Sequence, residues 1–249
     1  MKIIILAAGQ GSRLRPLTNE KPKCMVEYKS KPMIDYILDT VKECGIDDIA
    51  VINGYKKDVL ENYLKDENIT FFTNKTFDKT NMVSTLFNAK EFMNDDIIIS
   101  YSDIIYKKEI LEELINSKDD FSVVVDKKWR ELWSLRMENP LDDAETLKVK
   151  NGNIVELGKK PTNYSEIEGQ YIGLIKISKD TINRVIEFYD NLDRDKMYDG
   201  TDFDNIYMTS FIQMIIDDLL DVKPMFIEGG WLEIDSVDDL NRYEECELL

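Results

Sequence analysis

Residues 1–23 constrain the fold more than any other part of the chain. Residues 3–6 form a continuous apolar run rich in β-branched side chains, which is typical of a strand buried on both faces in a parallel sheet. A loop of small residues and glycines follows directly, and the backbone N–H groups of such a loop approach an anion closely. Basic side chains that suit phosphate oxygens lie in and after this loop: Arg13, Arg15, Lys21 and Lys23. We therefore predict a strand followed by a loop that binds a triphosphate.

Two common phosphate-binding loops do not match this stretch. The dinucleotide-binding fingerprint requires a third glycine where Leu14 stands, and Pro16 opposes a helix that runs straight on. The Walker loop requires a Gly-Lys-Ser or Gly-Lys-Thr ending, which this loop lacks. The pattern at residues 9–23 is Gly-x-Gly-Ser-Arg-Leu-x-Pro-Leu-Thr-x-x-x-Pro-Lys, and it resembles the signature of the sugar-phosphate nucleotidyltransferase family.

The composition narrows the chemistry and the partners. The chain of 249 residues has 49 acidic and 32 basic side chains, and its formal charge of −17 argues against a nucleic-acid or membrane surface as partner. It contains no histidine, so catalysis must use Lys, Arg, Asp, Glu or a metal ion. The three cysteines, Cys24, Cys44 and Cys246, are widely spaced and indicate neither a disulfide nor a zinc site. Because no signal peptide or membrane span is recognisable, we expect a cytoplasmic protein with one catalytic domain over residues 1–249.

Beyond the loop, apolar strands alternate with amphipathic helices. The spacing of apolar side chains predicts helices over residues 32–44, 57–65, 82–93, 108–116, 180–189 and 206–219. Short apolar runs predict strands over residues 48–53, 69–73, 96–100, 121–126, 170–177 and 222–227. This alternation predicts an α/β fold with a Rossmann-like, mostly parallel sheet and helices on both faces. Ligands of such a sheet bind beyond the carboxyl ends of its strands.

One segment interrupts the alternation. Residues 127–147 show neither a clear helical nor a clear strand period, and we interpret them as an insertion. Residues 146–157 then give the clearest hairpin signal in the chain, because Asn151-Gly152-Asn153 joins two short apolar runs. The predicted fold therefore includes a small β-rich insertion.

Two aspartates lie at the predicted binding edge. Asp103 lies just beyond the strand at 96–100, and Asp235 follows the turn after the strand at 222–227. A helix cap is the alternative role for Asp103, but the next predicted helix begins several residues later. The two aspartates place hard oxygen ligands near the phosphate loop, and we expect them to bind Mg²⁺.

The resemblance to the nucleotidyltransferase family covers essentially the whole chain. It implies that a phosphorylated acceptor attacks the α-phosphate of a nucleoside triphosphate in line and that pyrophosphate leaves. Lys23, Arg13, Asp103 and Asp235 are the catalytic residues that it implies, with Mg²⁺ on the two aspartates. The later motifs at 168–173 and 233–235 look more like those of the phosphocholine cytidylyltransferases of bacterial surface decoration. That likeness implies CTP as the nucleotide.

The resemblance also implies two sets of binding residues. The nucleotide-binding set is Leu6, Ala7, Ala8, Gly9, Gly11, Ser12, Arg13, Lys23, Asn81, Ser84 and Ser102. The acceptor-binding set is Trp129, Trp133, Arg136, Lys160, Glu168, Tyr171, Asp204 and Glu233. Asn81 and Ser84 also stand at the start of a predicted helix, where a role as helix caps fits the sequence equally well.

The expected acceptor is a small phosphorylated metabolite with an amine. The Glu-Lys-Pro element of the sugar enzymes appears here as Lys159-Lys160-Pro161, which disfavours a hexose phosphate. The acidic loop at 190–204 offers Asp199, Asp202 and Asp204 to a cation, and Trp129 with Trp133 offers cation–π contact. Within the branch, the likeness is strongest to enzymes that act on phosphorylated L-glutamine in bacterial capsular phosphoramidate synthesis.

Three alternatives stay open at this point. Phosphocholine is the second choice of acceptor. A sugar 1-phosphate uridylyl- or thymidylyltransferase keeps the same glycine loop. A nucleotide-sensing regulatory subunit with an inactive transferase fold is the alternative from outside the enzymes, although Lys23, Asp103 and Asp235 are all present.

Overall fold

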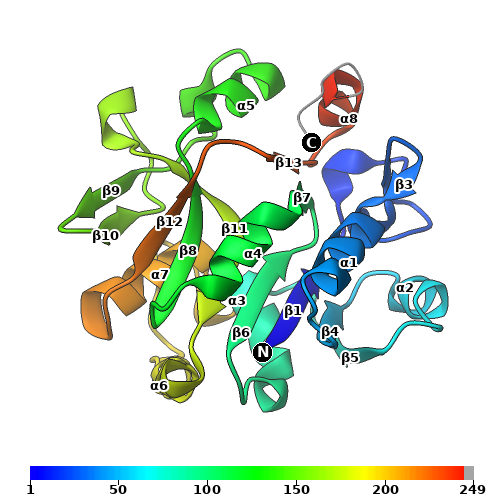
Figure 1. Cartoon of the computed structure of the whole chain (residues 1–249), viewed down its shortest axis with the longest axis horizontal. Coiled ribbons are helices and arrows are strands. Elements are labelled where there is room, and N and C mark those ends of the chain that lie inside the picture. Colours follow the sequence, from blue (N-terminus) through cyan, green and yellow to red (C-terminus); the bar gives the residue numbers. More distant parts are fainter. Residues whose placement is uncertain (244–249) are drawn as a thin grey trace.

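A seven-stranded sheet forms the centre of the molecule (Figure 1). We describe it from a computed structural model in which residues 1–243 are placed, so Cys246 lies outside the described residues. The strands are, in spatial order, β12 (Lys223–Ile227), β8 (Phe121–Asp126), β11 (Gln170–Ile177), β6 (Ile97–Tyr101), β1 (Lys2–Ala7), β4 (Asp48–Asn53) and β5 (Ile69–Thr73). β11 runs antiparallel to both of its neighbours, and the other pairs are parallel. The expected mostly parallel sheet is therefore confirmed.

The buried strand β1 divides the hydrophobic core in two. Ile3 and Ile5 pack on one face of the sheet, and Ile4 and Leu6 pack on the other, because successive side chains of a strand point to opposite faces. The first face is covered by α1 (Met33–Glu43) and α4 (Lys108–Asn116), which cross the near side of the sheet in Figure 1. The second is covered by α3 (Met82–Leu86), α6 (Lys179–Asp190) and α7 (Met208–Asp218). Helices thus cover both faces, as predicted.

Three small antiparallel sheets surround the central one. They pair β2 (Glu27–Tyr28) with β3 (Lys31–Pro32), β7 (Ile104–Tyr106) with β13 (Trp231–Glu233), and β9 (Leu147–Lys150) with β10 (Asn153–Leu157). The turn between β9 and β10 has positive φ at Asn151 (53°) and Gly152 (78°), which a two-residue hairpin of this kind requires. The predicted hairpin and the β-rich insertion are confirmed.

The remaining helices lie around this frame. They are α2 (Lys57–Tyr63), α5 (Trp129–Arg136) and α8 (Val237–Tyr243), with short 3₁₀ helices at Ser12–Leu14, Lys23–Met25, Phe87–Phe92, Pro140–Asp142, Tyr164–Glu166 and Phe203–Asn205. α5 and α8 lie at the top of Figure 1, beyond the carboxyl end of β1. Within residues 1–243, no helix combines the length and the apolar character that a bilayer crossing requires.

The sequence predicted no helix within residues 127–147, and this is wrong, because α5 is a helix. Trp129, Leu132 and Trp133 recur at helical spacing and are buried on one face of α5. Charged residues fill the positions between them, and the short apolar face is too sparse to show a period over the longer window.

The single helix expected over residues 82–93 is also wrong in its second half. α3 ends at Leu86, and a 3₁₀ helix with non-helical dihedrals at Ala89 follows. The Asn88 amide donates to the backbone carbonyls of Ser84 and Thr85, so a side chain competes with the helical ladder at this point.

Candidate active site

The pairing of β7 with β13 brings the two predicted metal-binding aspartates together. β7 begins directly after Asp103, and β13 ends two residues before Asp235. The strands pair antiparallel, with Glu233 opposite Ile104, and the Ile234 N–H donates to the Asp103 carbonyl at 2.9 Å. Residues that are far apart in the sequence therefore meet because one short sheet fixes their register.

Lys23 lies between these two carboxylates. Its Nζ is 2.6 Å from Oδ2 of Asp103 and also donates to Oδ1 of Asp235. Burial opposes the charge on Lys23, but the two carboxylates outweigh burial and raise its pKa. Burial likewise opposes ionisation of Asp235, yet Lys23 and the neighbouring arginines lower its pKa. Lys23 and Asp235 are therefore both charged at neutral pH.

The acidic cluster has the donors that a divalent metal ion requires. Asp103, Glu233 and Asp235 each offer one carboxylate oxygen, and these oxygens lie within 4.8 Å of one another. The second oxygen of Asp103, Oδ1, is buried and accepts no hydrogen bond. Oxygen-only donors suit hard cations such as Mg²⁺, and the Lys23 ammonium contributes the balancing charge in this arrangement. The residues present therefore fit the metal that the sequence predicts.

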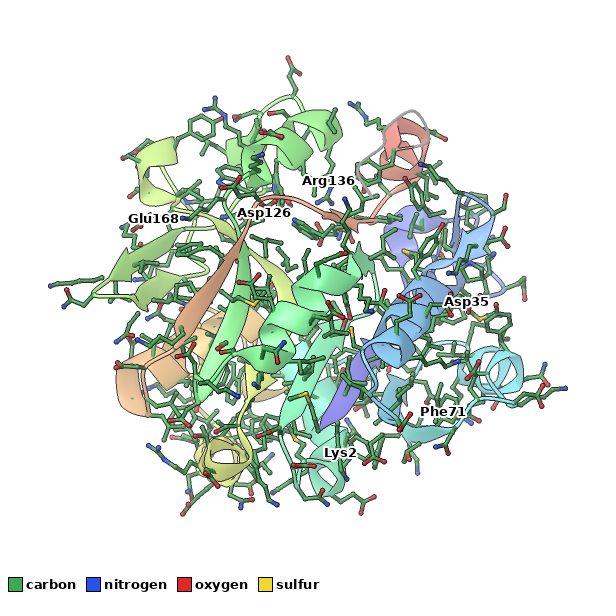
Figure 2. All side chains as sticks on the ribbon, in the orientation of Figure 1. Lys2, Asp35, Phe71, Asp126, Arg136 and Glu168 are labelled. Carbon is green, nitrogen blue, oxygen red and sulfur yellow. The ribbon has the colours of Figure 1, made fainter. Side chains whose placement is uncertain are left out.

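Arg136 holds the far side of the cluster. Its guanidinium donates to Glu233, to Asp235 at 3.0 Å and to Asp239 at 3.2 Å, and its side chain is only 4% exposed. Asp239 in turn accepts the backbone N–H groups of Asp235 and Ser236, both at 2.9 Å. Figure 2 shows Arg136 between α5 and the chain that leads into β13. The guanidinium thus ties α5, β13 and α8 to one point.

The signature loop is shaped by close packing as well as by charge. Gly11 has φ +58°, and a Cβ placed there would lie 2.8 Å from the Cβ of Lys23. The buried Thr18 hydroxyl donates to the Gly11 carbonyl at 2.8 Å. By contrast, the space around Gly9 is open within 4 Å of the corresponding position. Gly11 and Thr18 therefore position Lys23, whereas Gly9 leaves room for a ligand.

Two cavities flank the carboxylate cluster and share Met82 and Tyr101 in their walls. The smaller, about 100 Å³, is lined by Leu6, Ala7, Gly9, Lys23, Cys24, Met82, Tyr101, Ser102 and Asp103. The larger, about 370 Å³, is lined by Arg13, Met82, Tyr101, Trp133, Asp143, Glu145, Gln170, Tyr171, Ile172, Gly173, Tyr207, Met208, Thr209, Trp231, Glu233 and Asp235. The walls of the smaller cavity come mainly from β1, the signature loop and the end of β6, where a nucleotide was expected.

The predicted nucleotide set divides between cavity walls and loop. Leu6, Ala7, Gly9, Lys23 and Ser102 line the smaller cavity, and Arg13 lines the larger one with its guanidinium 3.0 Å from Asp235. Ala8, Gly11 and Ser12 belong to the loop but line neither cavity.

Asn81 and Ser84 serve the helix start. Asn81 accepts the N–H of Met82 at 2.8 Å as the cap of α3, and the Ser84 hydroxyl donates to the Asp204 carbonyl at 2.9 Å. Of the two roles left open by the sequence, capping is the one seen at Asn81, and contact with a nucleotide stays a prediction for both residues.

The predicted acceptor set also divides. Trp133, Tyr171 and Glu233 line the larger cavity. The other five residues line neither cavity. Trp129 packs against Trp133 and Tyr164, and Arg136 pairs with three carboxylates. Lys160 donates to the carbonyls of Leu141 and Asp142, Glu168 accepts the Val149 N–H, and the Asp204 carbonyl accepts a hydrogen bond from Ser84 of α3. Figure 2 shows Glu168 on the hairpin side of the molecule, away from Arg136. Direct contact of these five with an acceptor stays a prediction.

Comparison with known proteins gives the family. A profile described as nucleotidyl transferase matches residues 2–132, which include the signature loop, Lys23 and Asp103. The chain belongs to the nucleotidyltransferase family. It is therefore an enzyme of that class.

Three relatives show how far the similarity extends. The chain is 54% identical to the CTP:phosphoglutamine cytidylyltransferase of Campylobacter jejuni, with 96% of this chain and 98% of that protein covered. It is 29% identical to the choline-phosphate cytidylyltransferase of Streptococcus pneumoniae, over 98% of this chain and 97% of that protein. A solved structure of the CTP:phosphocholine cytidylyltransferase from Streptococcus pneumoniae superposes with a TM-score of 0.76 at 25% identity, covering 98% of this chain and 97% of the other.

Several side chains that line the larger cavity of this nucleotidyltransferase were not predicted from the sequence. Asp143, Glu145, Tyr207, Thr209 and Trp231 line it, although none was expected at the site. Tyr207 and Thr209 flank the start of α7, whose position at the cavity the sequence did not indicate, and Trp231 begins β13, which was not predicted. Asp143 and Glu145 lie in an irregular segment after α5, and no sequence pattern marks them.

Proposed function

We propose that this enzyme transfers CMP from CTP to phospho-L-glutamine and releases pyrophosphate, as a step in the synthesis of a bacterial capsular phosphoramidate. One observation carries the proposal: Lys23, Asp103 and Asp235 lie between a small cavity beside the glycine loop and a larger cavity rich in carboxylates and aromatic rings. The likeness to the Campylobacter jejuni enzyme supports the same acceptor. A cytoplasmic location agrees with substrates of this kind.

The smaller cavity and the signature loop would receive the nucleotide. The space beside the Gly9 Cα is open, and Lys23 and Arg13 are close enough to the carboxylates to contact phosphates held there. Phosphate oxygens that take the Lys23 ammonium would free Asp103 and Asp235 to bind a metal ion. When bound there, Mg²⁺ supplies positive charge that stabilises the phosphates in the transition state.

The larger cavity would orient the acceptor for in-line attack. A phosphate oxygen of the acceptor forms a bond to the α-phosphorus of CTP, the bond from that phosphorus to the β-phosphate oxygen breaks, and pyrophosphate leaves. The nucleophile is already ionised at neutral pH, so the protein needs no general base, and the absence of histidine from the sequence presents no obstacle. Alignment and charge neutralisation by Lys23 and Arg13 are the main contributions of the protein.

Phosphocholine is the second candidate acceptor. Trp133, Tyr171, Tyr207 and Trp231 line the larger cavity, and aromatic rings bind quaternary ammonium groups through cation–π contact. A sugar 1-phosphate has less support, because carboxylates and aromatic rings are prominent among the side chains that line this cavity.

Initial rates of pyrophosphate release test the proposal. CTP, UTP, dTTP and ATP are each combined with phospho-L-glutamine, phosphocholine and glucose 1-phosphate in the presence of Mg²⁺. We expect CTP with phospho-L-glutamine to give the highest kcat/KM, and Lys23→Ala to reduce kcat strongly with any pair that reacts. Preference for UTP and glucose 1-phosphate would contradict the proposal, and an absence of release with every pair would favour the regulatory alternative.

A further inference from the structure

Glu145 is the carboxylate of the larger cavity that lacks a strong partner. Within residues 1–243, its carboxylate accepts one long hydrogen bond of 3.4 Å, from the Thr209 hydroxyl, and takes part in no ion pair. The neighbouring acids are already engaged: Glu233 pairs with Arg136, and Asp143 accepts the indole N–H of Trp133 at 3.1 Å. The Glu145 carboxylate therefore keeps hydrogen-bonding capacity for a bound molecule.

The backbone of Glu145 is held firmly in place. Its N–H donates to the side-chain oxygen of Gln170 at 2.9 Å, and the Gln170 amide donates to its carbonyl at 2.6 Å. Gln170 is the first residue of β11 and is almost fully buried. This reciprocal pair fixes Glu145 relative to the central sheet, and such preorganisation is what a selective binding group requires.

Tyr101 and Tyr171 line the same cavity beside Glu145. Their rings form part of the cavity wall and bring no positive charge to the Glu145 carboxylate. Arg13 is the one basic side chain among the residues that line the cavity, and it is paired with Asp235. A carboxylate without an ion-pair partner beside aromatic rings is complementary to a group that carries positive charge and N–H donors.

We propose that Glu145 determines acceptor specificity by binding the ammonium group of the acceptor, beside the rings of Tyr101 and Tyr171. This inference rests on the transfer reaction proposed above. Glu145 replaces the acidic loop at 190–204 as the expected partner of the amine, because Asp199, Asp202 and Asp204 do not line the cavity. The ligand class is a phosphorylated metabolite with a protonated primary amine.

The electrostatic environment of Glu145 supports this role. Burial is the main cause that raises its pKa to about 7, with a smaller contribution from Asp143, and the hydrogen bond from Thr209 opposes the shift. The groups that face it from the packed elements are Tyr101 of β6, Tyr171 of β11 and Thr209 of α7, and none of them carries a positive charge. An ammonium ion supplies that charge, so binding of the acceptor should strengthen as Glu145 ionises.

Calorimetric binding of two probes tests the proposal without relying on turnover. The probes are phospho-L-glutamine and its α-N-acetyl derivative, which keeps the phosphate but loses the positive charge. Wild-type protein should bind the amine roughly 10- to 100-fold more tightly than the acetylated probe, and Glu145→Gln should reduce this ratio to near one. The matched control is Glu138→Gln, which removes an exposed carboxylate from the same insertion and should leave the ratio unchanged.

The pH profile and the steady-state rates separate the possible outcomes. In wild-type protein the ratio of the affinity for phospho-L-glutamine to that for its acetylated derivative should rise as pH increases from 6 to 8. In Glu145→Gln this ratio should stay constant. If Glu145→Gln keeps both the wild-type ratio and its pH dependence while its thermal unfolding shows a folded protein, the inference is wrong. If wild-type protein binds the amine in the predicted way but releases no pyrophosphate from CTP, the transfer reaction is wrong and the ammonium subsite stands. If wild-type protein binds neither probe, the subsite is wrong.

Discussion

At the scale of single residues, Arg136 has the most demanding environment. Its guanidinium is 4% exposed and donates to three carboxylates, so a variant without the positive charge leaves Glu233, Asp235 and Asp239 facing one another. Removing one partner of a buried ion pair costs about 3–5 kcal/mol of unfolding free energy. We predict a loss of this size for Arg136→Met, measured by urea unfolding.

The control for this prediction is on the same helix. Arg130 lies over the ring of Tyr164 at 3.9 Å and is exposed, so Arg130→Met should cost less than about 1 kcal/mol. Equal stability of Arg136→Met and Arg130→Met would show that the buried network does not hold the acidic cluster together.

Glu145 gives a prediction for the pH dependence of stability. Its pKa is raised from 4.5 to about 7 in the folded protein, so the folded state binds the proton more tightly than the unfolded chain. The stability that this provides is complete below pH 4.5 and is lost as pH rises to about 7. Without an acceptor, the melting temperature of wild-type protein should therefore fall by a few degrees relative to that of Glu145→Gln between pH 5 and pH 8. A constant difference across this range would contradict the buried, unpaired state of Glu145.

The residues that sequence reasoning placed well share one property. Lys23, Asp103 and Asp235 each lie a short distance from a strand or a rigid loop, so local patterns were enough to bring them to one edge of the sheet. Arg136 was expected to contact the acceptor, but its position depends on the packing of α5 against α8, which no local pattern encodes. For the same reason the sequence did not indicate Glu145, and the acidic loop at 190–204 was expected to bind the amine.

At the scale of elements, β11 depends on Gly173 where it passes the site. Gly173 has φ +88°, and a Cβ there would lie 2.5 Å from the ring of Tyr101, which lines both cavities. Gly173→Ala adds backbone strain to a steric clash, and we predict a loss of about 2–5 kcal/mol in unfolding free energy.

Gly152→Ala isolates the backbone strain from the clash. Gly152 has a similar φ of +78°, but the nearest atom to a Cβ there is 4.0 Å away on a flexible lysine. This variant should lose only about 1–2 kcal/mol. Thermal unfolding of the two variants side by side measures the difference, and equal losses would rule out crowding by Tyr101.

Elements were predicted well wherever the apolar period was long. The strands of the central sheet and the helices α1, α4, α6 and α7 agree with their predicted ranges within a few residues. The short pair β7 and β13 was not predicted, although it sets the geometry of the aspartates, because three-residue strands carry too little periodicity to be recognised. α5 was missed because its apolar face has only three positions.

At the scale of the whole molecule, the negative charge should make nucleotide binding depend strongly on the metal. The formal charge is −17, so a free triphosphate is repelled and its complex with Mg²⁺ is repelled less. We predict that CTP with Mg²⁺ raises the melting temperature in proportion to the logarithm of ligand concentration, whereas CTP with a chelator has little effect.

Asp103→Asn is the variant that connects this binding to the site. It keeps the shape of the side chain but removes a carboxylate whose Oδ1 has no hydrogen-bond partner. We expect the metal-dependent rise to become small, and turnover to fall on the order of 10²-fold. Glu20→Gln serves as the control for a lost negative charge, since Glu20 is exposed near the same loop. If Asp103→Asn and Glu20→Gln behaved alike, the acidic cluster would not be the metal site.

The central claim is that this enzyme transfers CMP to a phosphorylated acceptor that carries an amine. Competition among acceptors in a single reaction tests this claim most directly. Phospho-L-glutamine, phosphocholine and glucose 1-phosphate are mixed at equal concentrations with equal CTP and UTP in Mg²⁺, and the products are identified by mass early in the reaction. The account predicts that the CMP conjugate of phospho-L-glutamine dominates. A majority of UDP-glucose, or of any product without an amine, would contradict it.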